Sequence, residues 1–135
     1  MKYRVFGAIA MATVMFASAA SATVYECNIK AGPYIPPVMI ITDEDGKIGV
    51  FDGLIRDVYG APIKGKLAVD NAKRATYSWK VKGFKATETN SGRTVIPKLS
   101  FRLTRQKSSN AAKVQVKAVG YKNTFRSSGK CKIAK

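Results

Sequence analysis

The sequence predicts an all-β domain, a small antiparallel β-barrel or β-sandwich of about seven to nine strands closed by a disulfide between its ends. Two observations support this fold class. Apolar and polar residues alternate with a period of two through most of the second half of the chain, and turn-forming residues separate these runs. The two cysteines lie near the two ends of the chain that remains after an export signal. No helix longer than a turn or two is expected.

Residues 1–22 have the pattern of a secretory signal peptide. Two cations lie within the first four residues, residues 5–17 are apolar, and residues 20–22 read Ala-Ser-Ala, a small-residue cleavage site. The apolar stretch is shorter than the roughly 20 residues that a membrane-spanning helix needs. We therefore expect cleavage near Ala22 and a periplasmic or secreted product, residues 23–135, that forms one domain and does not span a membrane.

The first half of this domain is predicted to hold four short strands. They are residues 24–30, 38–42, 47–51 and 64–70. The acidic turn at residues 43–46 joins the second and third strands as a hairpin, because Gly46 can supply a positive φ. Residues 32–37 must be extended, since their prolines forbid a helix. For residues 52–60 the pattern leaves a single helical turn and a strand both open.

The second half predicts longer strands at residues 74–82, 98–104 and 113–118, which alternate clearly. Their apolar face holds Ala75, Tyr77, Trp79, Val81, Leu99, Phe101, Leu103, Val114, Val116 and Ala118. Polar loops at residues 88–93 and 107–110 separate the strands, so they should form a meander. A last strand over residues 123–133 would close the fold.

Cys27 and Cys131 are expected to form a structural disulfide, because an exported protein folds in an oxidising compartment. In the chain-entropy model, closing a loop of about 100 residues stabilises a protein by up to about 4–5 kcal/mol. Two thiolates are too few for a metal site, and a redox pair normally has C-x-x-C spacing.

Charge divides the domain into two unequal parts. Residues 71–135 carry 17 Lys or Arg and one carboxylate, whereas residues 23–70 carry 5 cations and 7 carboxylates. Seven cations at the polar positions of the alternating strands are predicted to share one outer sheet face: Arg74, Lys80, Lys82, Lys98, Arg102, Lys113 and Lys117. Such a face predicts an anionic partner, namely anionic lipid, lipopolysaccharide or an acidic polymer. The alternative is a solvated exterior without a partner.

Other function classes fit this sequence less well. The chain has no histidine, which excludes the common catalytic triads and most zinc sites, so we expect neither an enzyme nor a cofactor or metal. Nucleic acid is a poor match, because the alternating aromatic residues lie on the apolar face. A second hypothesis is a protein-interaction or inhibitor module that uses the loops at residues 34–37 and 52–60.

A set of short motifs extends along nearly the whole mature chain. It consists of Tyr25-Glu26-Cys27, Ile35-Pro36-Pro37, the Asp-rich hairpin, Asp52, Gly60-x-Pro62, Asn71, Arg74, Trp79 and Gly129-Lys130-Cys131. This pattern resembles an uncharacterised family of small secreted proteins from Gram-negative alphaproteobacteria. The resemblance implies export and carries over no activity and no site residue.

Overall fold

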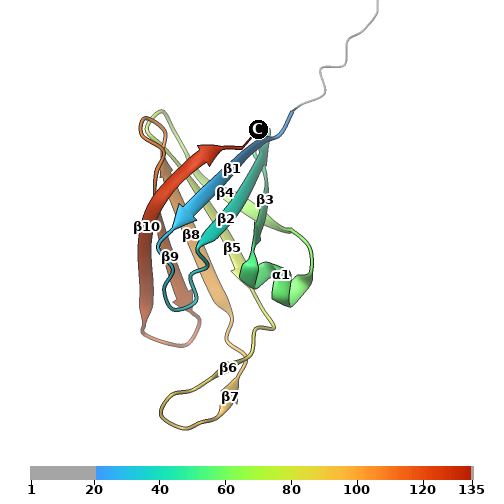
Figure 1. Ribbon diagram of the computed structural model, residues 1–135, viewed down its shortest axis with the longest axis vertical. Coiled ribbons are helices and arrows are strands. Elements are labelled where there is room, and N and C mark those ends of the chain that lie inside the picture. The colour runs from blue at the N-terminus through green and yellow to red at the C-terminus, as the bar shows by residue number, and fades with distance from the viewer. Residues whose placement is uncertain (1–20, 135) are drawn as a thin grey trace, which may run out of the picture.

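The computed structural model describes residues 21–134, so nearly all of the predicted signal peptide lies outside the described residues. Its main strands are β1 (Thr23–Ile29), β2 (Val38–Glu44), β3 (Lys47–Asp52), β4 (Ile63–Asp70), β5 (Arg74–Val81), β8 (Leu99–Gln106), β9 (Ala111–Ala118) and β10 (Thr124–Ile133). They form a closed barrel in the order β1-β10-β9-β8-β5-β4-β3-β2, with antiparallel neighbours (Figure 1). The predicted all-β class is confirmed, and of the two expected architectures the barrel is present.

The disulfide joins the first and last strands, as predicted. Cys27 lies directly opposite Cys131 in the β1–β10 register, and their sulfur atoms are bonded at 2.03 Å. Two residues away, β10 approaches β1 so closely that a Cβ on Gly129 would overlap the backbone carbonyl of Asn28. Glycine at this position therefore permits the contact that closes the barrel.

The β2–β3 hairpin uses its acidic residues to build the turn. Asp45 and Gly46 both have positive φ, and the backbone N–H of Gly46 donates a hydrogen bond to Oδ1 of Asp43 at 2.9 Å. Two successive positive φ values suit the twist of a tight hairpin. The carboxylate of Asp43 is thus engaged within its own turn.

The segment that sequence reasoning left open forms a short helix, α1 (Gly53–Tyr59). Asp52 caps it, because its Oδ1 accepts a hydrogen bond from the backbone N–H of Ile55 at 2.8 Å, and Gly60 ends it with φ 73°. Ile55 is buried in the core. Among residues 21–134 no helix has the length and apolar character needed to cross a membrane.

The barrel interior is filled by the predicted apolar face. Tyr77, Phe101 and Leu103 are almost completely buried, and the rings of Trp79 and Phe101 stack with their centroids 5.3 Å apart. Offset stacking at such a distance adds to the stabilisation that burial alone provides. Large side chains from β5 and β8 therefore occupy the centre of the fold.

Residues 82–98 form an arm that extends beyond one end of the barrel (Figure 1). The arm contains a two-stranded sheet of its own, β6 (Ala86–Thr87) paired with β7 (Thr94–Val95). Sequence reasoning identified its polar tip as a loop but did not predict these two strands. At the base of the arm, the backbone N–H of Lys82 donates a hydrogen bond to the Tyr59 hydroxyl at 2.8 Å, which ties the arm to α1.

Candidate functional site

The seven predicted cations lie on one side of the barrel. Arg74 and Lys80 are on β5, Lys82 follows it, Lys98 precedes β8, Arg102 is on β8, and Lys113 and Lys117 are on β9. Strands β5, β8 and β9 are consecutive neighbours in the barrel. Six of the seven side chains are exposed and Lys98 is half-buried, whereas the alternate positions face the core. The shared outer face that the alternation predicts is therefore present.

The register places neutral polar residues between these cations. Arg102 lies opposite Ser78 of β5 on one side and opposite Gln115 of β9 on the other. Lys80 and Lys117 both lie opposite Ser100, one on each side of it. Like charges directly opposite one another destabilise a sheet, and this alternation avoids that contact. It also leaves hydroxyl and amide groups between the positive charges.

A fourth strand extends the same face. Arg126 of β10 is exposed and lies opposite Gln115, two strands away from Arg102. Sequence reasoning missed Arg126, although it stands at a polar alternating position between Phe125 and Ser127. We use the term basic wall for the outer face of β5, β8, β9 and β10 that carries the seven predicted cations and Arg126.

The upper part of the basic wall is hollowed into a groove of about 590 Å³. Four cations line it: Arg74, Arg102, Lys113 and Arg126. The neutral lining includes Thr104, Gln106, Gln115 and Ser128. Guanidinium groups bind phosphate and carboxylate oxygens through paired N–H donors, and the hydroxyl and amide groups can donate to the remaining oxygens. The groove thus has the donors that an anionic group requires.

The lower part of the basic wall is a cluster of three lysines at the base of the arm. The positive charge of Lys82, followed by that of Lys80, lowers the pKa of the Lys98 ammonium group below its ordinary value. Lys82 and Lys98 are 16 positions apart in the sequence. They come together because the pairing of β5 with β8 ends at Val81 and Leu99, and Lys82 and Lys98 are the next residues outside this last pair.

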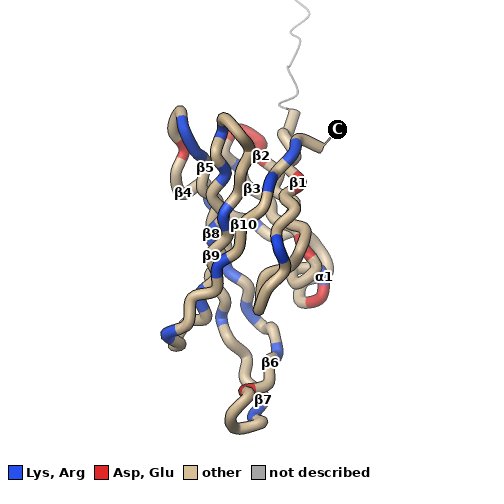
Figure 2. Tube along the Cα trace, turned by 60° about the vertical axis from the view of Figure 1, so that its left-hand side comes forward, with Lys and Arg blue, Asp and Glu red and all other residues tan. Residues whose placement is uncertain are grey.

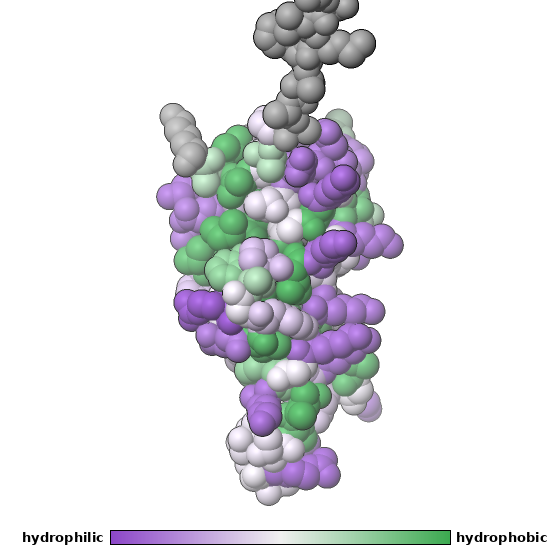
Figure 3. Space-filling view, turned by 90° about the vertical axis from the view of Figure 1, so that its right-hand side faces the viewer, coloured by the Kyte–Doolittle hydropathy of each residue, from purple (hydrophilic) through white to green (hydrophobic). Residues whose placement is uncertain are grey.

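Within residues 21–134, no cation of the basic wall forms an ion pair with a carboxylate. Four ion pairs join side chains within residues 21–134, and their cations are Arg56, Arg93, Lys107 and Lys132. None of these belongs to the wall. Figure 2 shows cationic positions recurring along β8, β9 and β10, while acidic positions lie near the β2–β3 turn and on α1, with others beside β4, β1 and β7. In Figure 3, hydrophilic side chains project in rows along one edge of the molecule.

The two loops of the alternative hypothesis lie at the arm end of the barrel. Residues 53–59 form α1, where the exposed side chains of Arg56 and Asp57 pair with one another at 3.3 Å. In the other loop, the ring of Tyr34 packs edge-on against Phe84 of the arm, with centroids 5.7 Å apart. Both segments therefore contact the base of the arm.

Comparison with protein-family models, with curated proteins and with solved structures found no match. Among residues 21–134, no cluster of three or more potential metal ligands is present. The basic wall combines guanidinium, ammonium, hydroxyl and amide groups. Groups of these kinds can donate hydrogen bonds to anions.

Proposed function

We propose that this protein is an exported, non-enzymatic binding protein whose basic wall engages an anionic component of the cell envelope. The observation that carries this proposal is the groove in which Arg74, Arg102, Lys113 and Arg126 meet, none of them in an ion pair with a carboxylate of residues 21–134. After removal of residues 1–22 the product would act in the periplasm or outside the cell.

The energetics of the wall favour a partner with several negative charges. Eight cations on one face repel one another, and such self-repulsion destabilises a folded protein unless counter-charges are supplied. Each basic residue near an anionic surface contributes about 1 kcal/mol of attraction. Within the lysine cluster, the charge of Lys82 is the first cause that lowers the pKa of Lys98, as such repulsion requires. An anionic partner would relieve it.

Vesicle co-sedimentation tests the proposal. The purified protein should bind vesicles that contain phosphatidylglycerol, and should not bind vesicles of phosphatidylcholine alone. Binding should weaken steeply as salt rises from about 50 to 500 mM, because screening acts strongly on exposed charges. Retention on heparin, an acidic polymer, should show the same dependence on salt.

A pair of matched double variants makes the test specific. Arg102→Glu with Lys113→Glu reverses two charges in the groove, whereas Lys47→Glu with Arg56→Glu makes the same change in net charge on β3 and α1, at two residues that do not line the groove. The groove variant should lose at least about tenfold in affinity. Equal loss in both variants would show that only net charge matters and would contradict the role of the wall.

A further inference from the structure

A second pocket, separate from the groove, lies beneath the arm. It has a volume of about 580 Å³, within the range typical of small-molecule sites. Its lining includes three aromatic residues and three polar ones: Tyr34, Tyr121, Phe125, Glu88, Asn90 and Asn123. These come from the loop after β1, the arm, and the segment from the β9–β10 turn into β10, so the fold assembles the pocket from distant parts of the chain.

The aromatic side of the pocket is held by a residue with an unusual backbone conformation. Tyr34 has φ 61°, a left-handed value that bulky side chains rarely adopt. Its ring packs against Phe125 with centroids 5.3 Å apart and against Phe84 at 5.7 Å. Strained residues of this kind persist where the surroundings fix them, and they cluster at binding sites. The strain here places an aromatic ring in the pocket wall.

The polar side contains Glu88, the one carboxylate among residues 71–135. The Ser91 hydroxyl donates to its Oε2 at 2.7 Å, and the Tyr121 hydroxyl donates to its Oε1 at 3.2 Å. These two bonds, together with Arg93, hold the pKa of the Glu88 carboxyl below its usual value. At neutral pH the pocket therefore presents an ionised acceptor, paired with Arg93 at 3.3 Å, which can accept a further hydrogen bond from an N–H or O–H donor.

We infer that this pocket binds an N-acetylated amino-sugar residue. A sugar ring has a face of C–H groups that packs against aromatic rings and a rim of hydroxyls that bind amide and carboxylate groups. The acetamido substituent adds a methyl group, for which Val95 and Pro97 provide an apolar surface. Its N–H can donate to Glu88 and its carbonyl can accept from Asn90 or Asn123. This site is independent of the basic wall, because its contacts are with a neutral ligand.

Titration of the ¹⁵N-labelled protein with chitobiose, followed by NMR, tests the inference. Backbone amide signals of Thr87, Asn90 and Asn123 should shift, with a dissociation constant of about 1 mM, whereas those of Thr104 and Lys113 in the groove should not. Cellobiose, which lacks the acetamido groups, should bind at least about tenfold more weakly. The affinity for chitobiose should stay the same between low and high salt, unlike the binding of anionic vesicles.

Substitutions in the pocket lining test whether chitobiose binds there. Tyr121→Ala removes a half-exposed ring and the hydroxyl on Glu88, and Asn123→Ala removes an exposed amide, so neither disturbs the core. Each should weaken chitobiose binding at least about tenfold or abolish it. Ile133→Ala, at an exposed apolar residue at the far end of β10 that does not line the pocket, should leave it unchanged.

Three results would overturn the inference. They are the absence of pocket shifts at about 10 mM chitobiose, equal affinity for cellobiose, and shifts confined to the groove. Loss of vesicle binding in the groove variant would leave the chitobiose result untouched, so the two proposals fail separately.

Discussion

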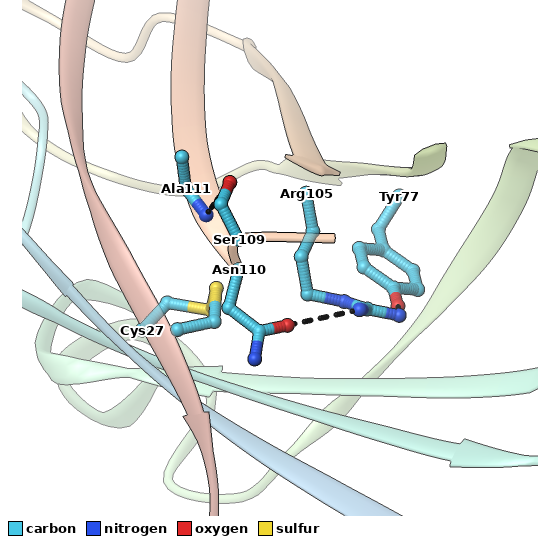
Figure 4. Close-up of a disulfide and its surroundings, with 7 residues drawn as sticks. Cys27, Tyr77, Arg105, Ser109, Asn110 and Ala111 are labelled. Atoms are coloured by element: carbon cyan, nitrogen blue, oxygen red, sulfur yellow. Dashed lines mark hydrogen bonds between the residues drawn. A yellow bond between two sulfur atoms is a disulfide. The ribbon is translucent and has the colours of Figure 1, made fainter. Parts of the chain in front are cut away.

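The guanidinium group of Arg105 lies over the ring of Tyr25 inside the barrel, with its Cζ atom 4.1 Å from the ring centroid. Its Nη1 donates to Oδ1 of Asn110 at 3.2 Å, and its Nη2 donates to the Tyr77 hydroxyl at 3.4 Å (Figure 4). Arg105 is 93% buried and belongs to none of the ion pairs within residues 21–134. A buried cation without a carboxylate is costly, and the aromatic ring and two acceptors offset that cost.

This arrangement is linked to the disulfide. The backbone carbonyl of Asn110 accepts a hydrogen bond from the N–H of Cys131 at 2.8 Å, while the side chain of the same residue binds Arg105. Figure 4 shows the guanidinium directed between Asn110 and Tyr77, with Asn110 drawn between it and the disulfide. Arg105 and Cys131 of the disulfide are therefore both hydrogen-bonded to the same residue, Asn110.

Replacement of Arg105 should destabilise the fold even when the charge is kept. Arg105→Lys retains the cation but lacks the planar group that reaches Asn110 and Tyr77 while covering Tyr25, so we expect a loss of about 1–3 kcal/mol in the free energy of unfolding. Arg105→Ala should lose about 2–4 kcal/mol, because it also leaves a cavity. Urea unfolding measures both. A lysine variant as stable as the original protein would show that charge alone matters here.

Asp52 should make stability depend on pH. Burial is the main cause that raises the pKa of its carboxyl above 3.8, and the backbone N–H groups of Ile55 and Leu54 oppose this more weakly. A raised pKa in the folded state means that the stabilisation is complete below the unfolded pKa and is lost as pH rises through the folded pKa. Asp52→Asn keeps a good helix cap and should remove this loss. Asp52→Ala removes the same titrating group, but it should be less stable than Asp52→Asn by about 1 kcal/mol at all pH values, because the cap is gone. Unfolding curves between about pH 3 and 7 distinguish the two.

Gly129 should tolerate no side chain. A Cβ at this position would meet the carbonyl and Cα atoms of the β1 backbone, which have no room to move while β10 remains paired. We expect Gly129→Ala to lower the free energy of unfolding by about 3 kcal/mol. Ser128→Ala, at the exposed neighbouring position, should change it by less than about 0.5 kcal/mol. Comparable effects at both positions in thermal or urea unfolding would contradict the close approach of the two strands.

Removal of one charge from the lysine cluster should change the pKa of Lys98. Lys82→Gln takes away the strongest neighbour of Lys98, so the pKa of Lys98 should rise toward its ordinary value of 10.5. Heteronuclear NMR of the lysine side chains follows this titration. Lys47→Gln, on β3, serves as the control and should leave the pKa of Lys98 unchanged. Addition of heparin to the original protein should also raise it, because an anion favours the charged ammonium. Absence of any rise with Lys82→Gln would mean that the three lysines do not converge.

Structure could be predicted from the sequence wherever apolar and polar residues alternate over many consecutive positions. Strand β8 alternates over its 8 residues, and β5 does so except at Thr76, which is buried although the alternation places it outward, so most core positions and the outward position of Arg102 could be predicted. The pairing of Cys27 with Cys131 could be predicted from the presence of only two cysteines and from the expected export of the chain. Alternation within a strand does not reveal whether a sheet closes on itself. Closure of the barrel requires β3 to pair with β4, and only three residue pairs join these two strands.

The parts that could not be predicted arise from tertiary contacts. Strands β6 and β7 have two residues each, too few to show any period. The positive φ of Tyr34 has no sequence signature, because tyrosine seldom adopts it. The pocket beneath the arm joins Tyr34, Glu88 and Phe125, whose proximity appears only once the barrel has closed. Arg126, by contrast, could have been predicted to face outward if the alternation of apolar and polar residues had also been followed along β10.

The alternation of cations with serine, threonine and glutamine on the basic wall fixes distances as well as charge. Same-face residues along a strand are about 7 Å apart, and alternate strands are about 10 Å apart. Lys80 and Lys117 have this second relationship, and so do Arg102 and Arg126. The cations of the wall are therefore spaced regularly both along and across the strands. A single ion would bind at one cation, whereas a polymer or a packed array of headgroups with a matching repeat would bind several cations at once and dissociate slowly.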